Sequence, residues 1–421
     1  MSRYNVRLLR CDSTAALVRE MQSIGADPQG IGIMAPKARL CLIRAEGLKL
    51  SAASILKQEL LSKGGDAALS GKVYHGGEHT TDVLIMGSRR TLGRVIRVLR
   101  RQPLPSLHDL AEELQQALRN EVRPVAASCC IGGHEFVWGR RTYIMGILNV
   151  TPDSFSGDGL AADTDSPEVM VKRAVAQAMV FLEEGADIID IGGESTRPGA
   201  GTVDAETEIA RVVPIIRALR QETDAPISVD TYKAPVARAA LDAGANMIND
   251  VWAMQMDPEM MPLAVERNVP VVLMHNRSKP HDAEQRERLG GRYVGVRYDD
   301  LMADIVRDLR QLVDNALAAG IAPERIIIDP GIGFGKTVDQ NLALLNHADE
   351  LRVLGFPILL GPSRKSFIGY TLDLPPDERV EGTLAAAVVG VVRRAADIMR
   401  VHDVRAVARA VRMADAITRA D

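Results

Sequence analysis

The stretch IMGILNVTPDSFSGDGL, residues 144–160, joins an apolar run that ends on Asn149 to a polar, glycine-containing segment. The apolar part, Ile144 to Leu148, predicts a buried strand, because a parallel strand that is covered on both faces is hydrophobic throughout and does not alternate. The residues that follow predict a loop. α/β proteins usually place their chemistry in loops that open with a polar side chain at the end of a buried strand. We therefore expect a functional site beside Asn149.

The same pattern recurs from Tyr143 to the C-terminus. Short apolar runs alternate with amphipathic segments such as MADIVRDLRQLVDNALAAG, residues 302–320, which has helical spacing of its apolar residues and ends on glycine. The apolar runs are YIMGILNV, DIIDIG, APISVD, NMIND, VPVVLMH, RIIIDP, FPILLG and DIMRVHD. Eight strand and helix units predict a TIM (β/α)8 barrel. A doubly wound open sheet is the alternative, but the number of runs and the missing GxGxxG after the first strand favour the barrel.

The residues before the barrel have a different pattern. Within residues 1–125, apolar runs at 38–43 and 83–86 alternate with helix-like segments, which predicts a smaller α/β domain whose role the sequence does not indicate. Prolines in RRQPLPSLHDL interrupt the helical pattern, and SLHDLAEELQQALRN predicts a last helix. We therefore expect an N-terminal domain over 1–125, a linker over 126–142 and the barrel over 143–421.

The composition limits the classes of partner. The chain has 421 residues, of which 46% are apolar, and its 51 Lys and Arg against 55 Asp and Glu give a net charge of −4. This balance offers no general attraction to nucleic acid or to an anionic membrane, so any anion site must be local. No stretch approaches the ~20 apolar residues of a membrane-spanning helix. We expect a cytoplasmic protein with no nucleic-acid or membrane partner, and reduced thiols for its four cysteines, which lack CxxC spacing.

Polar or charged residues stand at almost every predicted strand end, where a TIM barrel collects its functional side chains. A single Asp or Asn after a strand is more often a helix cap or a turn residue. Eight polar ends directed at one small mouth favour a functional site. They are Asn149, Glu194 to Arg197, Asp230, Asn249, Asp250, His275, Asp329, Ser363 to Lys365, Arg400 and His402.

One group of these residues suits a flat heterocycle. Asp230 and Asp329 supply carboxylates and Asn249 an amide, which can pair with N–H donors and ring acceptors on the edge of a ligand. Lys365 could reach a ring carbonyl or a ring nitrogen. These four residues therefore indicate a heterocycle site.

A second group indicates an anion site. Arg400 and His402 follow the eighth predicted strand and Asn149 follows the first, and these strands are neighbours in a closed barrel. Such a cluster suits a phosphate or a pyrophosphate, with a hard metal ion at the oxygen of Asn149. The alternative for Arg400 and His402 is a surface pair near the start of a helix.

The segment DPGIGFGKT, residues 329–337, looks like a phosphate loop but fails the pattern. GxxxxGK[ST] requires glycine at the position that Pro330 occupies. What remains is a glycine-rich turn that lets the backbone approach a ligand closely and places Phe334 at its rim.

Seven motifs in the barrel region resemble the dihydropteroate synthase family, in the family's order. They are GILNVTPDSFSGDG, DIIDIGGESTRPGA, ISVDTYK, MINDV, IIIDPGIGFGKT, GPSRKSFIG and RVHDV. The resemblance implies a transferase of folate biosynthesis in which p-aminobenzoate attacks the methylene carbon of 6-hydroxymethyl-7,8-dihydropterin pyrophosphate. The products are 7,8-dihydropteroate and pyrophosphate. It also implies Mg²⁺ as the cofactor, inhibition by sulfonamides, and no covalent nucleophile; we expect a homodimer.

The resemblance assigns roles to residues by position. Asn149, Lys365 and Asp329 are the expected catalytic residues, and Asn149 is the expected metal ligand. The expected pterin site comprises Asp230, Asn249, Asp329, Lys365 and Met274. The expected pyrophosphate site comprises Asn149, Arg400 and His402. The expected aminobenzoate site comprises Thr196, Arg197, Pro198, Phe155, Phe334 and Ser366.

Two features depart from the family pattern. After the fifth strand the chain has MHNRSKP, residues 274–280, where many members have a further methionine and a glutamine-glycine pair. The resemblance therefore does not predict how the pocket floor near Met274 and Asn276 is formed. The N-terminal 125 residues do not resemble the pyrophosphokinase that some organisms fuse to this enzyme. The alternative functions are a pterin-dependent methyltransferase, against which SRKS and ESTRPG argue, and a barrel that binds pterin without catalysis.

Overall fold

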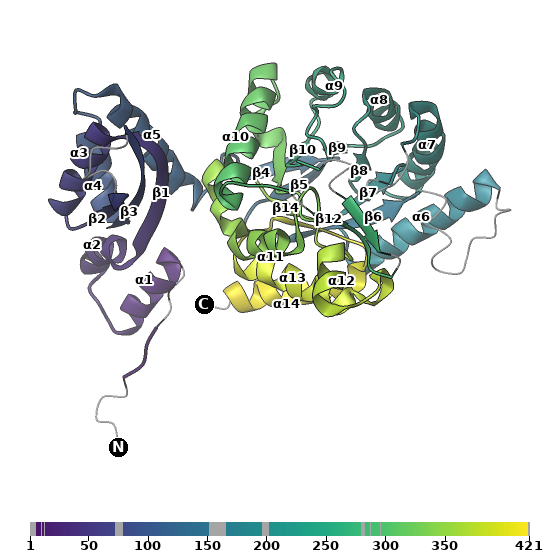
Figure 1. Cartoon of the computed structure of the whole chain (residues 1–421). Helices are drawn as coiled ribbons and strands as arrows, with labels where there is room; N and C mark the ends of the chain where they lie inside the picture. Colours follow the sequence, from purple (N-terminus) through teal and green to yellow (C-terminus); the bar gives the residue numbers. More distant parts are fainter. Residues whose placement is uncertain are drawn as a thin grey trace. The chain divides into compact units, whose positions relative to one another are not determined.

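The chain forms two compact units, Met1–Val122 and Arg123–Ala420. The computed structural model describes residues 6–9, 11, 13–71, 79–150, 166–195, 202–278, 283–286, 288–294 and 296–419 (Figure 1). Each unit has its own hydrophobic core. Within the described part of the chain, no helix is both long and apolar enough to span a membrane.

The N-terminal unit is a small α/β fold, as the sequence predicts. Its antiparallel sheet has the order β1-β3-β2. One face of the sheet packs on helices through a core that includes Leu56, Ile85, Val95 and Leu107. Its elements are α1 (Thr14–Ser23), α2 (Pro28–Ala38), β1 (Leu40–Lys49), α3 (Leu50–Leu61), β2 (Asp66–Leu69), β3 (Thr80–Ser88), α4 (Arg89–Leu99) and α5 (Pro105–Asn120).

The second unit contains the predicted TIM barrel. Its eight strands are parallel neighbours in the order β13-β10-β9-β8-β7-β6-β15-β14, and a parallel bridge between Ile328 and Ile358 connects the two ends of this order. All eight apolar runs identified from the sequence form strands. They are β6 (Tyr143–Asn149), β7 (Ile188–Gly192), β8 (Ile227–Asp230), β9 (Met247–Asp250), β10 (Val271–Met274), β13 (Ile326–Asp329), β14 (Leu359–Leu360) and β15 (Ile398–Val401).

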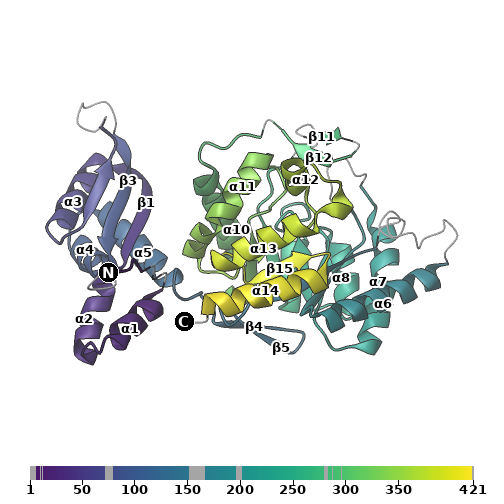
Figure 2. The same cartoon turned by 90° about the horizontal axis from the view of Figure 1, so that it is seen from below.

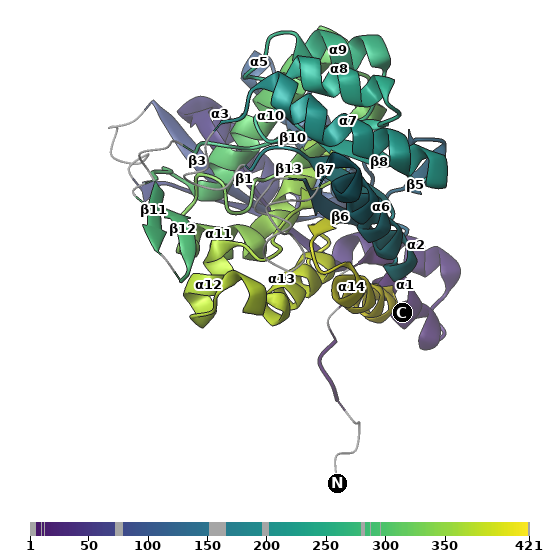
Figure 3. The same ribbon diagram turned by 90° about the vertical axis from the view of Figure 1, so that its right-hand side faces the viewer.

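Helices surround these strands (Figures 1 and 3). Strand β6 shows how closely they pack, because a Cβ atom added to Gly146 would lie only 3.0 Å from Phe181 Cδ2 and 3.2 Å from Val404 Cγ2. A side chain at this position would push the neighbouring helices outward. The helices are α6 (Pro167–Glu184), α7 (Ala205–Glu222), α8 (Ala234–Asp242), α9 (Met260–Arg267), α10 (Leu301–Ala319), α11 (Val338–His347), α12 (Ser366–Leu372), α13 (Val380–Val392) and α14 (Val404–Arg419).

Residues 126–142, which we expect from the sequence to be a linker, contain an antiparallel hairpin of β4 (Ser128–Ile131) and β5 (His134–Val137) (Figure 2). Its two-residue turn is Gly-Gly with positive φ at both positions, as a type I′ turn requires. Phe136 and Trp138 join one buried cluster with Met145, Ile188 and other strand residues of the barrel. The hairpin was not apparent from the sequence because its strands are only four residues long and are held by tertiary packing.

Candidate active site

Polar side chains gather where the parallel strands end. Asn149, Asp230 and Asp329 are the last residues of β6, β8 and β13, and Asn249 and Arg400 lie next to the last residues of β9 and β15. Because all these strands run in the same direction, their carboxyl ends meet at one end of the barrel. The predicted mouth of the barrel is therefore formed.

Arg400 is at the centre of a buried network. Its Nε donates to Asp190 Oδ2 at 2.6 Å, and its Nη2 donates to Asp230 Oδ2 at 2.5 Å. Asn249 Nδ2 donates to the same oxygen of Asp190 at 3.1 Å. The guanidinium of Arg400 thus binds the carboxylates of two neighbouring strands, β7 and β8. The β7 carboxylate also binds the side-chain amide of Asn249 on β9.

Asp190 is a residue that the sequence analysis missed. It is fully buried within β7, and its Oδ1 has no hydrogen-bond partner among the described residues. A buried, unsatisfied carboxylate oxygen is costly unless a ligand or a water molecule completes its hydrogen bonds. The available signal was a charged residue inside the otherwise apolar run DIIDIG.

The network shifts the acidity of its members. Burial raises the pKa of Asp230, and the neighbouring Arg400 opposes this rise. Burial by itself would lower the pKa of Arg400, but Asp190 and Asp230 raise it above its ordinary value. Arg400 is therefore positively charged at any physiological pH, and it favours the ionised form of Asp230.

Asp329 and Lys365 form the second part of the site. Asp329 Oδ1 accepts a hydrogen bond from the backbone N–H of Gly331 at 2.7 Å, and burial raises the pKa of Asp329. Lys365 Nζ donates to the carbonyl of Ile332 and lies 4.4 Å from the centroid of the Phe334 ring. Burial lowers the pKa of Lys365 to about 8, although Asp329 opposes this effect. Lys365 can therefore change its charge near neutral pH.

The two parts of the site are adjacent. A Cβ atom added to Gly361 would lie 3.9 Å from both Arg400 Cβ and Lys365 Nζ. Asn149 belongs to the same region, because a Cβ atom added to Gly192 would lie 3.4 Å from Asp230 Cβ and 3.7 Å from Asn149 Oδ1. The expected heterocycle and anion groups are therefore not spatially separate.

Other predicted residues have well-defined neighbours. Met274 is buried at the end of β10, in register with Asp329 on β13. His402 Nδ1 lies 3.1 Å from Ser363 Oγ, which also accepts a hydrogen bond from the backbone N–H of His402. Ser366 is the first residue of α12. Phe155, Thr196, Arg197 and Pro198, predicted for the aminobenzoate site, lie outside the described residues.

Lys336 is a second residue that the sequence analysis missed. Its Nζ is buried and donates to the carbonyls of Gly331 and Phe334 at 2.9 and 3.0 Å, and it lies 3.1 Å from His275 Nδ1. Burial lowers the pKa of Lys336 to about 7. Lys336 thus holds the glycine-rich turn that follows Asp329. The sequence indicated only a possible phosphate-binding role for the segment GFGKT that contains Lys336.

The segment MHNRSKP has structural contacts of its own. Asn276 donates to the carbonyl of Val251 at 3.1 Å and accepts a hydrogen bond from the N–H of Ser278 at 2.8 Å. Arg277 binds Asp308 and Asp304 on α10 at 2.7 and 3.2 Å. The departure from the family pattern therefore attaches this loop to helix α10.

A metal ion would have few protein ligands here. Among the residues that the structure describes, no group of three or more His, Cys, Asp or Glu side chains is placed to hold a metal. The amide oxygen of Asn149 is a hard ligand at the mouth of the barrel, which suits an ion that is held mainly by phosphate oxygens and water.

Known proteins resemble this chain closely. The family model described as pterin binding enzyme matches residues 145–402. The dihydropteroate synthase of Clostridium beijerinckii is 50% identical over 289 residues, which cover 69% of this chain and 99% of that protein.

Solved structures show the same likeness. The dihydropteroate synthase of Clostridium difficile, determined in the presence of pteroic acid, is 45% identical with a TM-score of 0.59 and covers 66% of this chain and 98% of its own. The Xanthomonas albilineans enzyme with 4-aminobenzoic acid is 42% identical with a TM-score of 0.61, and it covers 70% of this chain and 99% of its own.

Proposed function

The chain belongs to the dihydropteroate synthase family, and from this premise we propose how its own residues carry out the family's reaction. It is a transferase of folate biosynthesis that joins 6-hydroxymethyl-7,8-dihydropterin pyrophosphate to p-aminobenzoate, giving 7,8-dihydropteroate and pyrophosphate. The close likeness to dihydropteroate synthases leaves no support for the methyltransferase or for a barrel without catalysis.

The pterin ring is held by the buried acceptors of the mouth. We assign Asp230, Asn249 and Asp329 to its N–H edge and Lys365 to a ring carbonyl or nitrogen, with Met274 against its face. The observation that carries this assignment is the convergence of buried carboxylates and Lys365 at the strand ends. A buried carboxylate accepts hydrogen bonds strongly, because water does not compete for its oxygens.

The leaving pyrophosphate is assigned to Arg400, His402 and Asn149. Arg400 carries a permanent charge, and its bonds from Nε and Nη2 to Asp190 and Asp230 fix the guanidinium, so that Nη1 can donate to phosphate oxygens. Magnesium, when bound, would neutralise charge on the pyrophosphate, with Asn149 as its protein ligand. Stabilisation of the departing anion lowers the barrier without a covalent enzyme intermediate.

p-Aminobenzoate approaches from the side of Phe334 and Ser366, and we assign Phe155, Thr196, Arg197 and Pro198 to the same site. Its amine nitrogen attacks the methylene carbon, the bond from that carbon to the pyrophosphate oxygen breaks, and the amine loses one proton. Lys365 lies against Phe334 and so connects the aminobenzoate side to the pterin side. We expect sulfonamides to compete with p-aminobenzoate.

The remaining assignments concern the whole chain. We propose that the catalytic domain covers 143–421 and that residues 126–142 and 1–125 stand outside its chemistry. We also propose a homodimer located in the cytoplasm. Sedimentation of the purified chain would test the homodimer, since a monomer at micromolar concentration contradicts it.

The central experiment measures pyrophosphate release from the pterin substrate with and without p-aminobenzoate, in the presence of Mg²⁺. We expect release only when both substrates are present, and Asp329→Asn should reduce it strongly. Asp314→Asn is the matched control, because Asp314 is exposed on α10. Release that is independent of p-aminobenzoate, or none at all, would contradict the proposed reaction.

A further inference from the structure

The N-terminal unit and the barrel carry opposite charges. Residues 1–122 contain 18 Lys and Arg against 12 Asp and Glu, a net charge of +6. Residues 123–421 contain 33 against 43, a net charge of −10. The near-neutral net charge of the whole chain therefore includes a basic N-terminal unit, which has no role in the proposed reaction.

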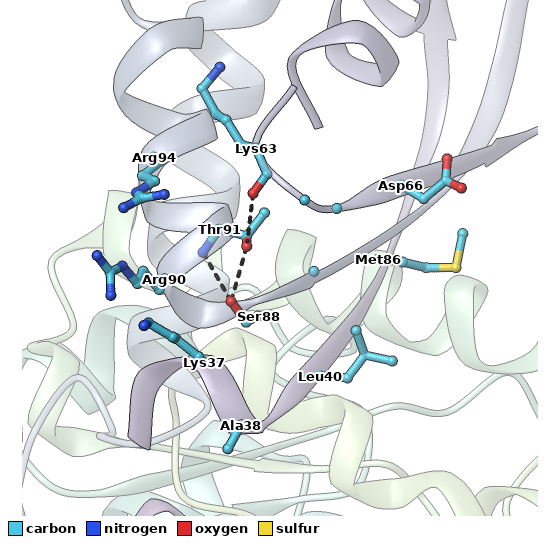
Figure 4. Close-up of a pocket in the computed structure, with 13 residues that line it drawn as sticks. Lys37, Ala38, Leu40, Lys63, Asp66, Met86, Ser88, Arg90, Thr91 and Arg94 are labelled. Atoms are coloured by element: carbon cyan, nitrogen blue, oxygen red, sulfur yellow. Dashed lines mark hydrogen bonds between the residues drawn. The ribbon is translucent and has the colours of Figure 1, made fainter. Parts of the chain in front are cut away.

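The N-terminal unit contains a cavity of about 820 Å³ that is wide open to solvent (Figure 4). Its walls are the C-terminal end of α2, the turn from α3 to β2, the end of β3 and the first turns of α4. This volume lies within the range of ~300 to 1,000 Å³ that is usual for small-molecule sites. All residues that line the cavity belong to the N-terminal unit.

One end of the cavity is basic. Lys37, Lys63, Arg90 and Arg94 line it, and Figure 4 shows the charged ends of Lys37, Arg90 and Arg94 on the same side. Lys63 forms an ion pair with Glu59. Arg90 makes one long hydrogen bond, 3.5 Å to the carbonyl of Ile33. Within the described residues, no carboxylate forms an ion pair with the other three cations.

Two of these cations, Arg90 and Arg94, do not stabilise their own helix. Arg90 is in the first turn of α4 and Arg94 in the second, and the first turn contains no acidic residue. Positive charges near a helix N-terminus oppose the helix dipole and so destabilise the helix. Arg89 is stabilised by Glu121 and by the carbonyl of Leu118, whereas Arg90 has only the long hydrogen bond to the carbonyl of Ile33 and Arg94 has no such partner among the described residues. A bound anion would supply it.

The other end of the cavity is different. Leu40 and Met86 provide apolar surface, and the carboxylate of Asp66 stands beside them (Figure 4). The hydroxyls of Ser88 and Thr91, 3.0 Å apart, lie between the two ends. An apolar wall with one carboxylate suits a heterocycle that presents N–H donors.

We propose that this cavity binds a nitrogen heterocycle that carries two or more phosphates. The phosphates would lie against Lys37, Arg90 and Arg94, and the heterocycle against Leu40, Met86 and Asp66. Two sources share this chemistry: a nucleoside di- or triphosphate, and the pterin pyrophosphate on which the barrel acts. In either case the N-terminal unit senses or collects a phosphorylated small molecule at a site that is separate from catalysis.

A nucleic acid fits the same features less well. Single-stranded nucleic acids are held by aromatic side chains that stack on the bases, but residues 1–122 contain only two such residues, Tyr4 and Tyr74, and the described residues that line the cavity include no aromatic side chain. The net charge of −10 on the rest of the chain would also repel a long polyanion. A compact anion meets only the local positive charge.

The test titrates the full chain calorimetrically with GTP, ATP, the pterin pyrophosphate and inorganic tripolyphosphate. We expect a nucleotide to bind the wild type with one site per chain, or the pterin pyrophosphate to bind with two. Arg94→Glu should weaken the nucleotide site at least tenfold, or reduce the pterin stoichiometry from two to one. Lys37→Glu, on a different helix, should have the same effect, which excludes a local folding defect at α4.

Arg101→Glu is the matched control, because Arg101 is exposed, lies just after α4 and does not line the cavity. It should change the affinity less than twofold. An equal loss in Arg101→Glu would show general electrostatic attraction and overturn the proposal, as would a single pterin site with no nucleotide binding. Equal affinities for tripolyphosphate and for the heterocyclic esters would contradict the assignment of a heterocycle to Leu40, Met86 and Asp66. The proposed reaction of the barrel is tested separately, by measuring pyrophosphate release that depends on p-aminobenzoate.

Discussion

Arg400 links residues that sequence reasoning assigns to two different parts of the pterin pyrophosphate substrate. From position alone Arg400 belongs with the pyrophosphate and Asp230 with the pterin. The hydrogen bond of 2.5 Å between them puts these two groups in direct contact. Loss of Arg400 would leave Asp190 and Asp230 as unpaired buried carboxylates, so it should also disturb the pterin side.

We therefore predict that Arg400→Ala destabilises the fold by ~3 to 5 kcal/mol, the usual effect of removing one partner from a buried ion pair. Without the cation, burial keeps the pKa of Asp230 raised, so the variant is most stable at low pH and loses stability as the pH rises. Denaturant unfolding at pH 5 and pH 8 should show the larger loss at pH 8. Arg405→Ala, at an exposed position on α14, is the control. An equal loss at both pH values contradicts the prediction.

Lys365 should make pterin binding depend on pH. Its pKa of about 8 means that the charged donor is present below pH 8 and disappears as the pH rises above that value. A hydrogen bond to a charged group contributes ~1.5 to 3 kcal/mol, so the affinity for a pterin without pyrophosphate should fall roughly 10- to 25-fold between pH 7 and pH 9.5. Calorimetric titration between pH 7 and 9.5 measures this.

Lys365→Arg is the informative comparison for that titration. Arginine stays charged throughout this range, so the variant should show a flat profile whatever its affinity at pH 7. A wild-type profile that is equally flat would mean that Lys365 does not donate to the pterin as a cation.

At the scale of elements, the glycine-rich turn after β13 decides where Asp329, Phe334 and Lys365 lie. Gly331 has φ of +68°, and a Cβ atom there would lie 1.9 Å from the carbonyl oxygen of His275. Gly333 has φ of +80°, and its Cβ atom would meet Lys365 Cδ at 2.5 Å. The first contact is with rigid backbone and the second with a flexible side chain.

The two glycines should consequently respond differently to alanine. Gly331→Ala should cost more than about 2 kcal/mol of stability, because the backbone conformation and the clash both oppose it. Gly333→Ala should lose less stability but should displace Lys365 and weaken pterin binding. Gly320→Ala, at a left-handed helix end where the nearest atom is 3.8 Å away, measures the conformational cost alone. Thermal unfolding and pterin titration of the three variants separate these effects, and identical behaviour of Gly331→Ala and Gly333→Ala would refute the distinction.

At the scale of the whole molecule, the hairpin β4–β5 belongs structurally to the barrel. Residues Arg123 onward fall in the second compact unit, and the N–H of Val125 donates to the carbonyl of Gly355 at 2.7 Å. Arg325 Nη1 donates to the carbonyl of Cys130 at 2.6 Å. With Phe136 and Trp138, these contacts cover apolar strand residues that would otherwise face water.

We predict that a chain beginning at Arg123 folds and keeps its affinity for pterin, because the N-terminal unit supplies none of the assigned barrel residues. A chain beginning at Tyr143 lacks the hairpin, and it should aggregate or unfold at a much lower temperature. Circular dichroism and pterin titration of both chains test this. A soluble Arg123 chain that fails to bind pterin would show that the N-terminal unit contributes to the site, and a fully stable Tyr143 chain would show that the hairpin is dispensable.

What the sequence by itself determined is local along the chain. Eight apolar runs, the helical periodicity between them and the polar residue at each strand end follow from neighbouring residues, and they predicted the barrel and its mouth. The motif resemblance added the chemistry. These features were readable because burial and helical spacing repeat within a few residues.

Only the tertiary structure decided which of these residues meet. Arg400 is 210 residues from Asp190 and 170 from Asp230 along the chain, and the three come together because β15 closes the barrel beside β6. Contacts across a closed barrel depend on strand order and register, which no local pattern encodes. For the same reason the sequence did not indicate the hairpin of β4 and β5. These two four-residue strands are held in place by the apolar surface of the barrel on which they pack.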